Sequence, residues 1–208
     1  MTKRSSFGVC ELCGERKAKA QMAPHLKKCI AARSGVGRPS SHLLLQARAS
    51  GAPEFWLIMA VTPEAKLKQV DALLRRVWLE CCGHMSRFYR KDGRDVGMTT
   101  AAGGAFDSIG SSLAYVYDFG SSTELVASLL AIVEAPLTKP VRLVARNEPL
   151  TWPCDVCEQP AASLCVECAD EYGGFYCGVH SEGHECGEDM LLPVVNSPRM
   201  GVCGYTGQ

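Results

Sequence analysis

Hydrophobic residues form short runs between residues 54 and 147, and their spacing predicts several strands and one long helix. FWLIMAV (55–61) is a continuous apolar run of strand length, whereas LAYVYDFG (113–120) alternates between apolar and polar positions. TELVASLLAIVEA (123–135) fits either a strand or an amphipathic helix, and its place after the alternating run favours a strand. Two shorter strand candidates are SRFYR (86–90) and VRLVARN (141–147).

The strongest helix candidate is TPEAKLKQVDALLRRVWLECCGH (62–84). Thr62 is a suitable N-cap, Pro63 fits the first helical position, and Glu64 complements the positive end of the helix dipole. Gly83 can end the helix. Apolar side chains recur at helical spacing at Leu67, Val70, Leu74, Val77 and Cys81. One long helix among several antiparallel strands indicates an α+β body.

Composition and charge limit the classes of protein to consider. The chain has 208 residues, 47% of them hydrophobic, and a formal net charge of zero, which is typical of a globular protein. No signal-peptide pattern or membrane-spanning run is visible, so we expect a cytoplasmic protein. In a reducing compartment, twelve cysteines indicate metal ligands or free thiols more than disulfides.

The C-terminal part of the chain contains two Cys-x-x-Cys pairs followed by more Cys and His. Zinc prefers four such ligands in a tetrahedron, so eight ligands predict two sites. Sequential filling would place the first four ligands in one site, whereas interleaved filling would combine alternate pairs. Interleaving gives one site of Cys154, Cys157, Cys177 and His180, and another of Cys165, Cys168, His184 and Cys186.

We favour the interleaved arrangement. The order of these ligands and the FYC sequence (175–177) resemble cross-brace fingers of the B-box and MYND kind, which implies a protein-interaction module. His184 and Cys186 are unusually close for that pattern, and Asp189 is an alternative to Cys186. A catalytic zinc normally keeps one position for water. Eight ligands for two ions leave no such position, which indicates structural sites.

The N-terminal part contains CELCGERKAKAQMAPHLKKC, with Cys10, Cys13, His25 and Cys29 at the spacing of a zinc finger. Pro24 can start a short helix that presents His25 and Cys29 on one face. The spacing is similar to ubiquitin-binding fingers of DNA-repair proteins, although Lys27 stands where those fingers carry an acid. With this finger the chain is expected to bind three zinc ions.

Charge is distributed unevenly between the ends. Residues 1–40 contain nine Lys or Arg and two acids, whereas residues 150–190 contain nine acids and no Lys or Arg. A basic end can attract nucleic acid or an acidic protein, and it can equally be a solvated face. The candidate partner-binding residues are Lys17, Lys19, Lys27, Lys28 and Arg38.

Cys81, Cys82, Cys203 and His84 remain outside these three sites. The C-terminus of a helix is its negative end, so it raises the pKa of a thiol and argues against an activated nucleophile there. Cys81 lies on the apolar face and is most simply a small core residue. Cys82 and His84 can meet Cys203 only through the fold. Whether these residues form a further site stays open.

The body itself resembles a known family. LRRVWLECCGHMSRF, YVYDFGSSTEL, ARNEP and NSPRMGVCGYTG are similar to a bacterial and archaeal family first described from an Ri-plasmid open reading frame and also noted as a transposon passenger. The likeness covers residues 54–149 and the tail, and it implies a compact α+β fold without an established activity.

The expected organisation follows from these segments. It comprises a C2HC zinc finger at 1–33, a linker and lead-in at 34–53, an α+β body at 54–149, a two-zinc cross-brace module at 150–190, and a Gly-rich tail at 191–208 that packs on the body.

We predict a zinc-binding, non-enzymatic interaction or adaptor protein that contacts nucleic acid or a protein through its basic finger. One alternative is an enzyme whose site lies around Cys82, His84, Asp118, Arg199 and Cys203. The other is a mobile-element accessory or regulator, which rests on the family resemblance.

Overall fold

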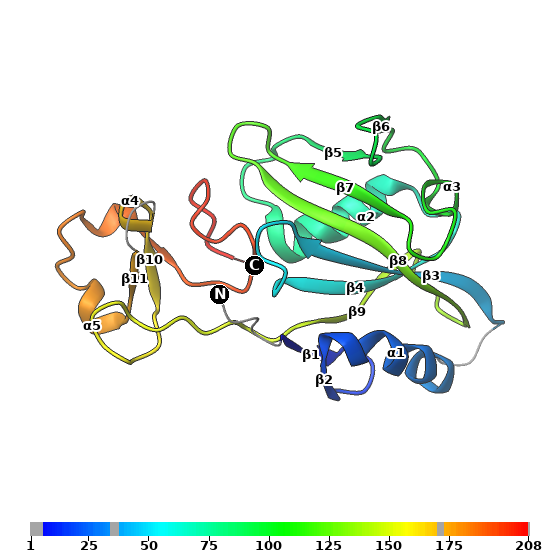
Figure 1. Ribbon diagram of the computed structural model, residues 1–208, viewed down its shortest axis with the longest axis horizontal. Coiled ribbons are helices and arrows are strands. Elements are labelled where there is room, and N and C mark those ends of the chain that lie inside the picture. The colour runs from blue at the N-terminus through cyan, green and yellow to red at the C-terminus, as the bar shows by residue number, and fades with distance from the viewer. Residues whose placement is uncertain (1–5, 34–37, 170–172, 208) are drawn as a thin grey trace. The chain divides into compact units, whose positions relative to one another are not determined.

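The computed structural model describes residues 6–33, 38–169 and 173–207. The chain divides into two compact units, which we describe separately (Figure 1). Unit 1 contains residues 1–75 and 85–148, and unit 2 contains residues 76–84 and 149–208. No helix within the described ranges is long and apolar enough to cross a membrane.

Unit 1 is built on a nine-stranded sheet in which every pairing is antiparallel, in the order β2-β1-β9-β4-β3-β8-β7-β5-β6. The strands are β1 (Phe7–Cys10), β2 (Arg16–Ala18), β3 (Ser40–Ala49), β4 (Trp56–Val61), β5 (Ser86–Tyr89), β6 (Asp95–Val96), β7 (Ser112–Tyr117), β8 (Thr123–Ala135) and β9 (Val141–Asn147). The helices are α1 (Lys19–Arg33), α2 (Leu67–Leu74) and α3 (Ala102–Ala105). The chain therefore has a mixed α and β fold with a large antiparallel sheet and few helices.

Helix α2 packs on one face of this sheet. The hydroxyl of Tyr115 on β7 donates to Asp71 on α2 at 2.7 Å, so Tyr115 points toward that helix. Leu125 on β8 pairs with Tyr115, so both side chains lie on the same face of the sheet. The register of β3 and β4 places Ala47 and Leu57 on that face as well. All four side chains are buried.

Helix α1 packs on the other face. Trp56 and Ile58 alternate with Leu57 along β4, and they share one hydrophobic cluster with Met22 and Leu26 of α1. All six residues of β4 are buried because both faces of the sheet are covered. Burial on both faces of the sheet explains why residues 55–61 are a continuous apolar run.

A bulge allows the 13-residue strand β8 to bury residues on both faces. Leu45 pairs with Leu129 whereas Leu44 pairs with Ala131, so β8 has an additional residue at this point. Odd-numbered residues up to Leu129 therefore face the α2 side, and Ala131 and the odd-numbered residues beyond it join the α1 cluster. The alternation in the sequence continues unbroken although the buried face changes.

The strands predicted at 55–61, 86–90, 113–120, 123–135 and 141–147 are confirmed as β4, β5, β7, β8 and β9. Residues 123–135 form a strand and not a helix. In contrast, Ser40–Ala49 forms a ten-residue strand, β3, between β4 and β8, within the span expected to be linker and lead-in. Its burial on both sides hides the alternation that marks a half-exposed strand.

The predicted helix at 62–84 is wrong at both ends. Thr62 to Ala65 form a turn, in which the Ala65 amide donates to Thr62 O at 3.0 Å. Helix α2 begins at Leu67, where Gln69 Oε1 accepts a hydrogen bond from the Lys66 amide at 2.8 Å. From Arg75 to Leu79 the chain continues as a π-helix, and no helix covers residues 80–84.

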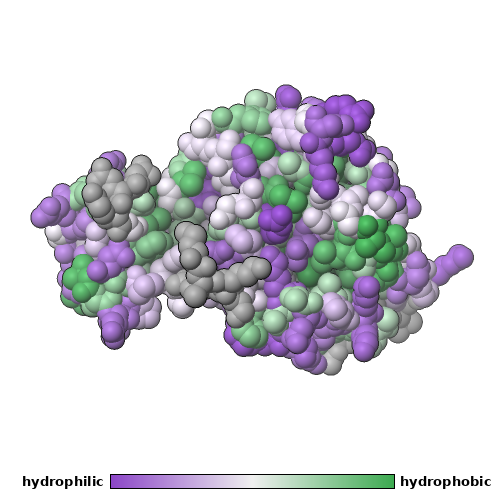
Figure 2. All heavy atoms as spheres, viewed as in Figure 1, coloured by the Kyte–Doolittle hydropathy of each residue, from purple (hydrophilic) through white to green (hydrophobic). Residues whose placement is uncertain are grey.

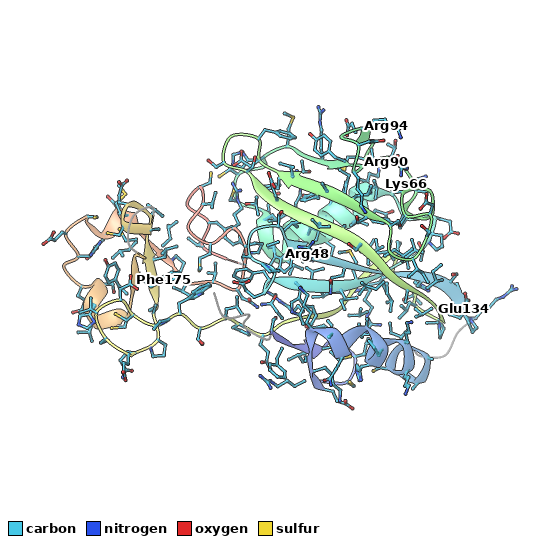
Figure 3. All side chains as sticks on the ribbon, in the orientation of Figure 1. Arg48, Lys66, Arg90, Arg94, Glu134 and Phe175 are labelled. Carbon is cyan, nitrogen blue, oxygen red and sulfur yellow. The ribbon has the colours of Figure 1, made fainter. Side chains whose placement is uncertain are left out.

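Unit 2 has a small three-stranded sheet with the order β11-β10-β12. Its elements are β10 (Ser163–Cys165), α4 (Val166–Ala169), β11 (Phe175–Tyr176), α5 (Gly178–Ser181), a 3-10 helix (Glu188–Met190) and β12 (Leu191–Pro193). The tail belongs to this unit and binds the end of the π-helix, because Ser197 Oγ donates to Trp78 O at 2.6 Å. Figure 3 labels Phe175 on β11, whose ring stacks on Trp152 at a centroid distance of 4.9 Å.

A polar network fastens α2 to the sheet in unit 1. Asp71 Oδ1 accepts hydrogen bonds from Ser86 Oγ at 2.6 Å and from the Tyr115 hydroxyl at 2.7 Å. Its Oδ2 lies 3.0 Å from Arg75 Nε. Burial, followed by the negative charge of Asp71, raises the pKa of Tyr115 far above its ordinary value, so its hydroxyl stays a donor.

Replacing Asp71 with alanine should lower the free energy of unfolding by about 2–3 kcal/mol, because two hydroxyls lose their acceptor in an enclosed site. Urea denaturation followed by tryptophan fluorescence measures this loss. Asp95→Ala is the matched control, since Asp95 is half exposed and lies 3.5 Å from Arg87 Nη1 at the surface. Equal midpoints for the two variants would contradict a stabilising role for the network.

Candidate metal centres

Cys and His side chains gather at four points in the structure, and every one of the twelve cysteines belongs to one of them. Within each group the ligand atoms all lie within 4.8 Å of one another. Zinc bonds of about 2.3 Å to sulfur and about 2.0 Å to nitrogen give a tetrahedron with S···S edges of roughly 3.8 Å and S···N edges of roughly 3.5 Å. The separations in these groups can therefore be compared directly with those of a zinc site.

The predicted N-terminal ligands converge. Cys10 Sγ lies 3.8 Å from Cys29 Sγ, and Cys13 Sγ lies 3.3 Å from His25 Nε2. Both separations match the edges of a zinc tetrahedron. The other ring nitrogen of His25 lies 3.7 Å from a carboxylate oxygen of Glu15, an arrangement that orients metal-bound imidazoles in many proteins.

This group is part of the core of unit 1. Cys10 ends β1, which pairs with both β2 and β9, and Cys29 is buried on α1 beside Leu26 and Ile30. The sequence suggested that Pro24 starts a short helix. In the structure α1 begins at Lys19, so Pro24 lies inside the helix. The apolar Met22 explains the earlier start, because helical geometry buries it with Leu26.

The candidate basic surface on the finger is smaller than its sequence suggests. Lys17 Nζ pairs with Glu15 at 2.8 Å. Lys19 Nζ donates to Pro53 O at 2.6 Å, and burial lowers its pKa. Lys27 and Lys28 are exposed on α1, and Arg38 is exposed beyond that helix.

The C-terminal ligands interleave. Cys154 Sγ and Cys177 Sγ each lie 3.4 Å from His180 Nδ1, and Cys157 Sγ lies 3.9 Å from Cys177 Sγ. The sequential alternative, with the first four cysteines in one site, does not fit this geometry. The first Cys-x-x-Cys pair meets the ligands that follow β11, as the cross-brace pattern requires.

The second C-terminal group includes Cys186 and not Asp189. Cys168 Sγ lies 3.5 Å from His184 Nε2 and 3.8 Å from Cys186 Sγ, and Cys165 completes the group. Asp189 is exposed on the 3-10 helix and belongs to none of the Cys and His groups among the described residues.

Backbone amides favour the thiolate form of two of these sulfurs. Burial opposes ionisation of Cys154, but hydrogen bonds from the amides of Cys177, Val156 and Cys157 lower its pKa to about 6. The pKa of Cys165 is lowered to about 7 by similar contacts, again against the effect of burial. Thiolate is the form that binds a metal ion, so both turns are prepared for one.

A tyrosine supports the second group from outside. A hydrogen bond with Cys168 and then burial raise the pKa of Tyr176 to about 12. The Tyr176 ring also packs on that of His184 at a centroid distance of 4.5 Å. One aromatic residue of β11 thus contacts two candidate ligands, which is typical of an outer-shell residue.

The fourth group contains Cys81, Cys82, His84 and Cys203, which the sequence left unassigned. Cys81 is not a core residue, because it is only partly buried and its Sγ accepts a hydrogen bond from Arg199 Nε at 3.4 Å. The sequence contains one sign that this group resembles the others: Gly directly follows Cys82 and Cys203, as it follows Cys13 and Cys186.

The residues of the alternative enzyme site divide between the two units. Cys82, His84, Arg199 and Cys203 belong to unit 2, whereas Asp118 belongs to unit 1. There Asp118 adopts a left-handed conformation (φ 64°) and accepts the Gly120 amide at 2.9 Å, as a turn residue does. Neighbouring thiols, first Cys81 and then Cys203, raise the pKa of Cys82 to about 11, which disfavours a nucleophilic thiolate.

Cys186→Ala should bind one metal ion fewer than the parent chain, whereas Asp189→Ala should keep the full complement. The reason is that Cys186 supplies a sulfur to its group and Asp189 supplies no oxygen. Native mass spectrometry of both variants, prepared side by side with zinc, measures this difference. Loss of an ion from Asp189→Ala alone would reverse the assignment.

Comparison with known proteins adds little to this geometry. No family model matches the chain, and no curated protein matches it. The chain is similar to the crystal structure of MM3350 from Methanosarcina mazei Go1, described as a protein of unknown function, with 16% identity and a TM-score of 0.40. The match covers 61% of this chain and 71% of that one. So distant a likeness assigns this chain to no family.

Proposed function

We propose that this chain is a zinc-stabilised interaction protein whose N-terminal and cross-brace metal sites are structural, and that its cross-brace module binds a protein partner. The observation that carries the proposal is the closed set of four protein ligands in each of these three groups. Four protein ligands fill the tetrahedron of a zinc ion and leave no position for a reacting water.

The cross-brace module presents a small apolar surface beside one of these groups. Val156 stands between Cys154 and Cys157, and Val179 stands between Cys177 and His180. Their side chains are 63% and 75% exposed. Figure 2 shows hydrophobic surface over α5, the helix that carries Val179. Because both valines lie on turns that bind the same ion, metal binding would fix them in place for a partner.

Charge favours a protein over nucleic acid as that partner. Acidic side chains surround the two valines in sequence, and residues 150–190 carry no Lys or Arg. Such a surface repels phosphates and attracts a basic peptide with an apolar anchor. Of the four candidate lysines on the N-terminal finger, Lys17 and Lys19 contact other groups of this chain, and the exposed Lys27 and Lys28 are a weak footprint for nucleic acid.

Selection of a displayed random-peptide library on the full chain tests this proposal. We expect enrichment of peptides that combine basic residues with a large apolar residue. The double variant Val156→Ser, Val179→Ser should bind the enriched peptide at least about tenfold more weakly, because it loses the buried apolar contact. Its zinc content should stay that of the parent chain, since neither valine is a ligand.

Two controls separate the possible outcomes. Met85→Ser and Ile109→Ser replace exposed apolar residues of unit 1 and should not change peptide binding. An electrophoretic shift with DNA or RNA at low salt that disappears in Lys27→Ala, Lys28→Ala would instead support nucleic acid as the partner. Peptide binding that survives the double valine substitution would reject the proposed surface.

A further inference from the structure

The end of the π-helix and the Gly-rich tail of unit 2 meet at a group of three thiols and one imidazole. Cys81, Cys82 and His84 follow the π-helix, and Cys203 comes from the tail. We propose that these four residues bind a fourth zinc ion, which fastens the tail to the end of the helix. This site is independent of the partner surface proposed above.

The geometry fits a tetrahedral site as well as that of the predicted finger does. His84 Nε2 lies 3.4 Å from Cys203 Sγ, and the corresponding separation between His25 Nε2 and Cys13 Sγ is 3.3 Å. Both match an S···N edge of roughly 3.5 Å. The donor set of three sulfurs and one nitrogen is also identical, and it selects zinc over magnesium, calcium or manganese.

The turns around these ligands share a backbone feature with two of the other groups. A glycine with positive φ directly follows Cys13 and Cys186, with φ of 76° and 86°. The same arrangement follows Cys82 and Cys203, where the glycines have φ of 74° and 65°. Glycine adopts this conformation without strain, so the chain can turn back around the sulfur that precedes it.

Cys203 is itself held in the left-handed region, with φ of 53°. This conformation is unfavourable for a residue with a Cβ atom. Such a conformation persists where surrounding contacts hold it in place. Coordination by Cys203 Sγ, beside His84, supplies such a contact.

A buried cation balances the charge of the proposed site. Three thiolates around a divalent ion leave a net charge of about −1. Arg199 is fully buried, and its Nε donates to Cys81 Sγ at 3.4 Å. A guanidinium in this place neutralises the anionic centre and orients one of its ligands, as outer-shell residues do.

The tail is already fixed next to the helix end by contacts that need no metal. Ser197 Oγ donates to Trp78 O at 2.6 Å and accepts the Arg199 amide at 2.9 Å. Ser197 and Arg199 are both buried. These bonds bring Cys203 near residues 81–84 at little further cost in chain entropy, so the ion binds to a prepared site.

Native mass spectrometry of the full chain, prepared with zinc under reducing conditions, should find four zinc ions in the parent protein. Cys203→Ser should bind three ions, and Cys203→His should regain the fourth because an imidazole replaces the lost sulfur. Val202→Ala, next to the ligand, is the control and should keep four ions. Three ions in the parent chain would overturn the proposal.

A second measurement uses only the parent chain and so does not depend on how a variant folds. If the fourth site holds zinc, a thiol-reactive disulfide reagent should find no rapidly reacting cysteine, because all twelve are bound. Rapid reaction of three thiols, or a disulfide between Cys82 and Cys203 in the reduced preparation, would reject the site.

Limited proteolysis tests whether the ion fastens the tail. Trypsin cuts after arginine, and Arg199 is buried in the folded chain. Cys203→Ser should be cleaved after Arg199 about tenfold faster or more, because the tail opens more often without the ion. Val202→Ala should be cleaved at the parent rate. A variant that loses one ion but keeps the parent rate would contradict the fastening role.

Discussion

Convergence of thiols and imidazoles on a few points is the constraint on which the organisation of unit 2 depends. This unit has one small sheet of short strands. Among its described residues, the buried apolar side chains other than cysteines are few: Trp78, Leu79, Leu164 and Tyr205. So little apolar burial does not offset the conformational entropy of the chain. On the proposed function, coordination supplies the missing free energy, and folding of the unit is coupled to metal binding.

Unit 1 depends on its metal group in a different way. Its sheet and the helices α1 and α2 bury a continuous core, so the unit does not need an ion to collapse. The finger ligands instead connect the hairpin of β1 and β2 to α1, whose residues Met22 and Leu26 cover one face of the sheet. On the proposed function, loss of the finger ion would therefore loosen α1 and expose apolar surface before it unfolded the sheet. The same kinds of ligand would thus stabilise the whole of unit 2 but only the helix α1 of unit 1.

How much the sequence could predict follows from how local each signal is. The alternation at 113–120 identifies a strand because one period spans the whole element, whereas 123–135 fitted a strand or a helix and was favoured as a strand because of the run before it. The start of α2 was missed because Thr62 and Pro63 offer a good cap that the fold uses as a turn, while the actual capping pair is Lys66 and Gln69. The three predicted metal groups contain a Cys-x-x-Cys pair, which is visible locally. The fourth joins residues 119 positions apart, and only the fold brings them together.

The four groups share their donors but differ in exposure, and this difference separates their roles. Cys10 and Cys29 are buried in the core of unit 1, whereas Cys82, after the π-helix, and Cys203, in the tail, are exposed. A competing ligand must reach an ion to remove it. If all four groups bind zinc as proposed, the buried group holds its ion as part of the core and the exposed one exchanges its ion more readily. Because the ion in the exposed group binds the folded tail and not the open one, its occupancy shifts the tail toward the docked state by mass action. The fraction of chains with a docked tail thereby rises with available metal, whereas the sheet of unit 1 has an apolar core of its own.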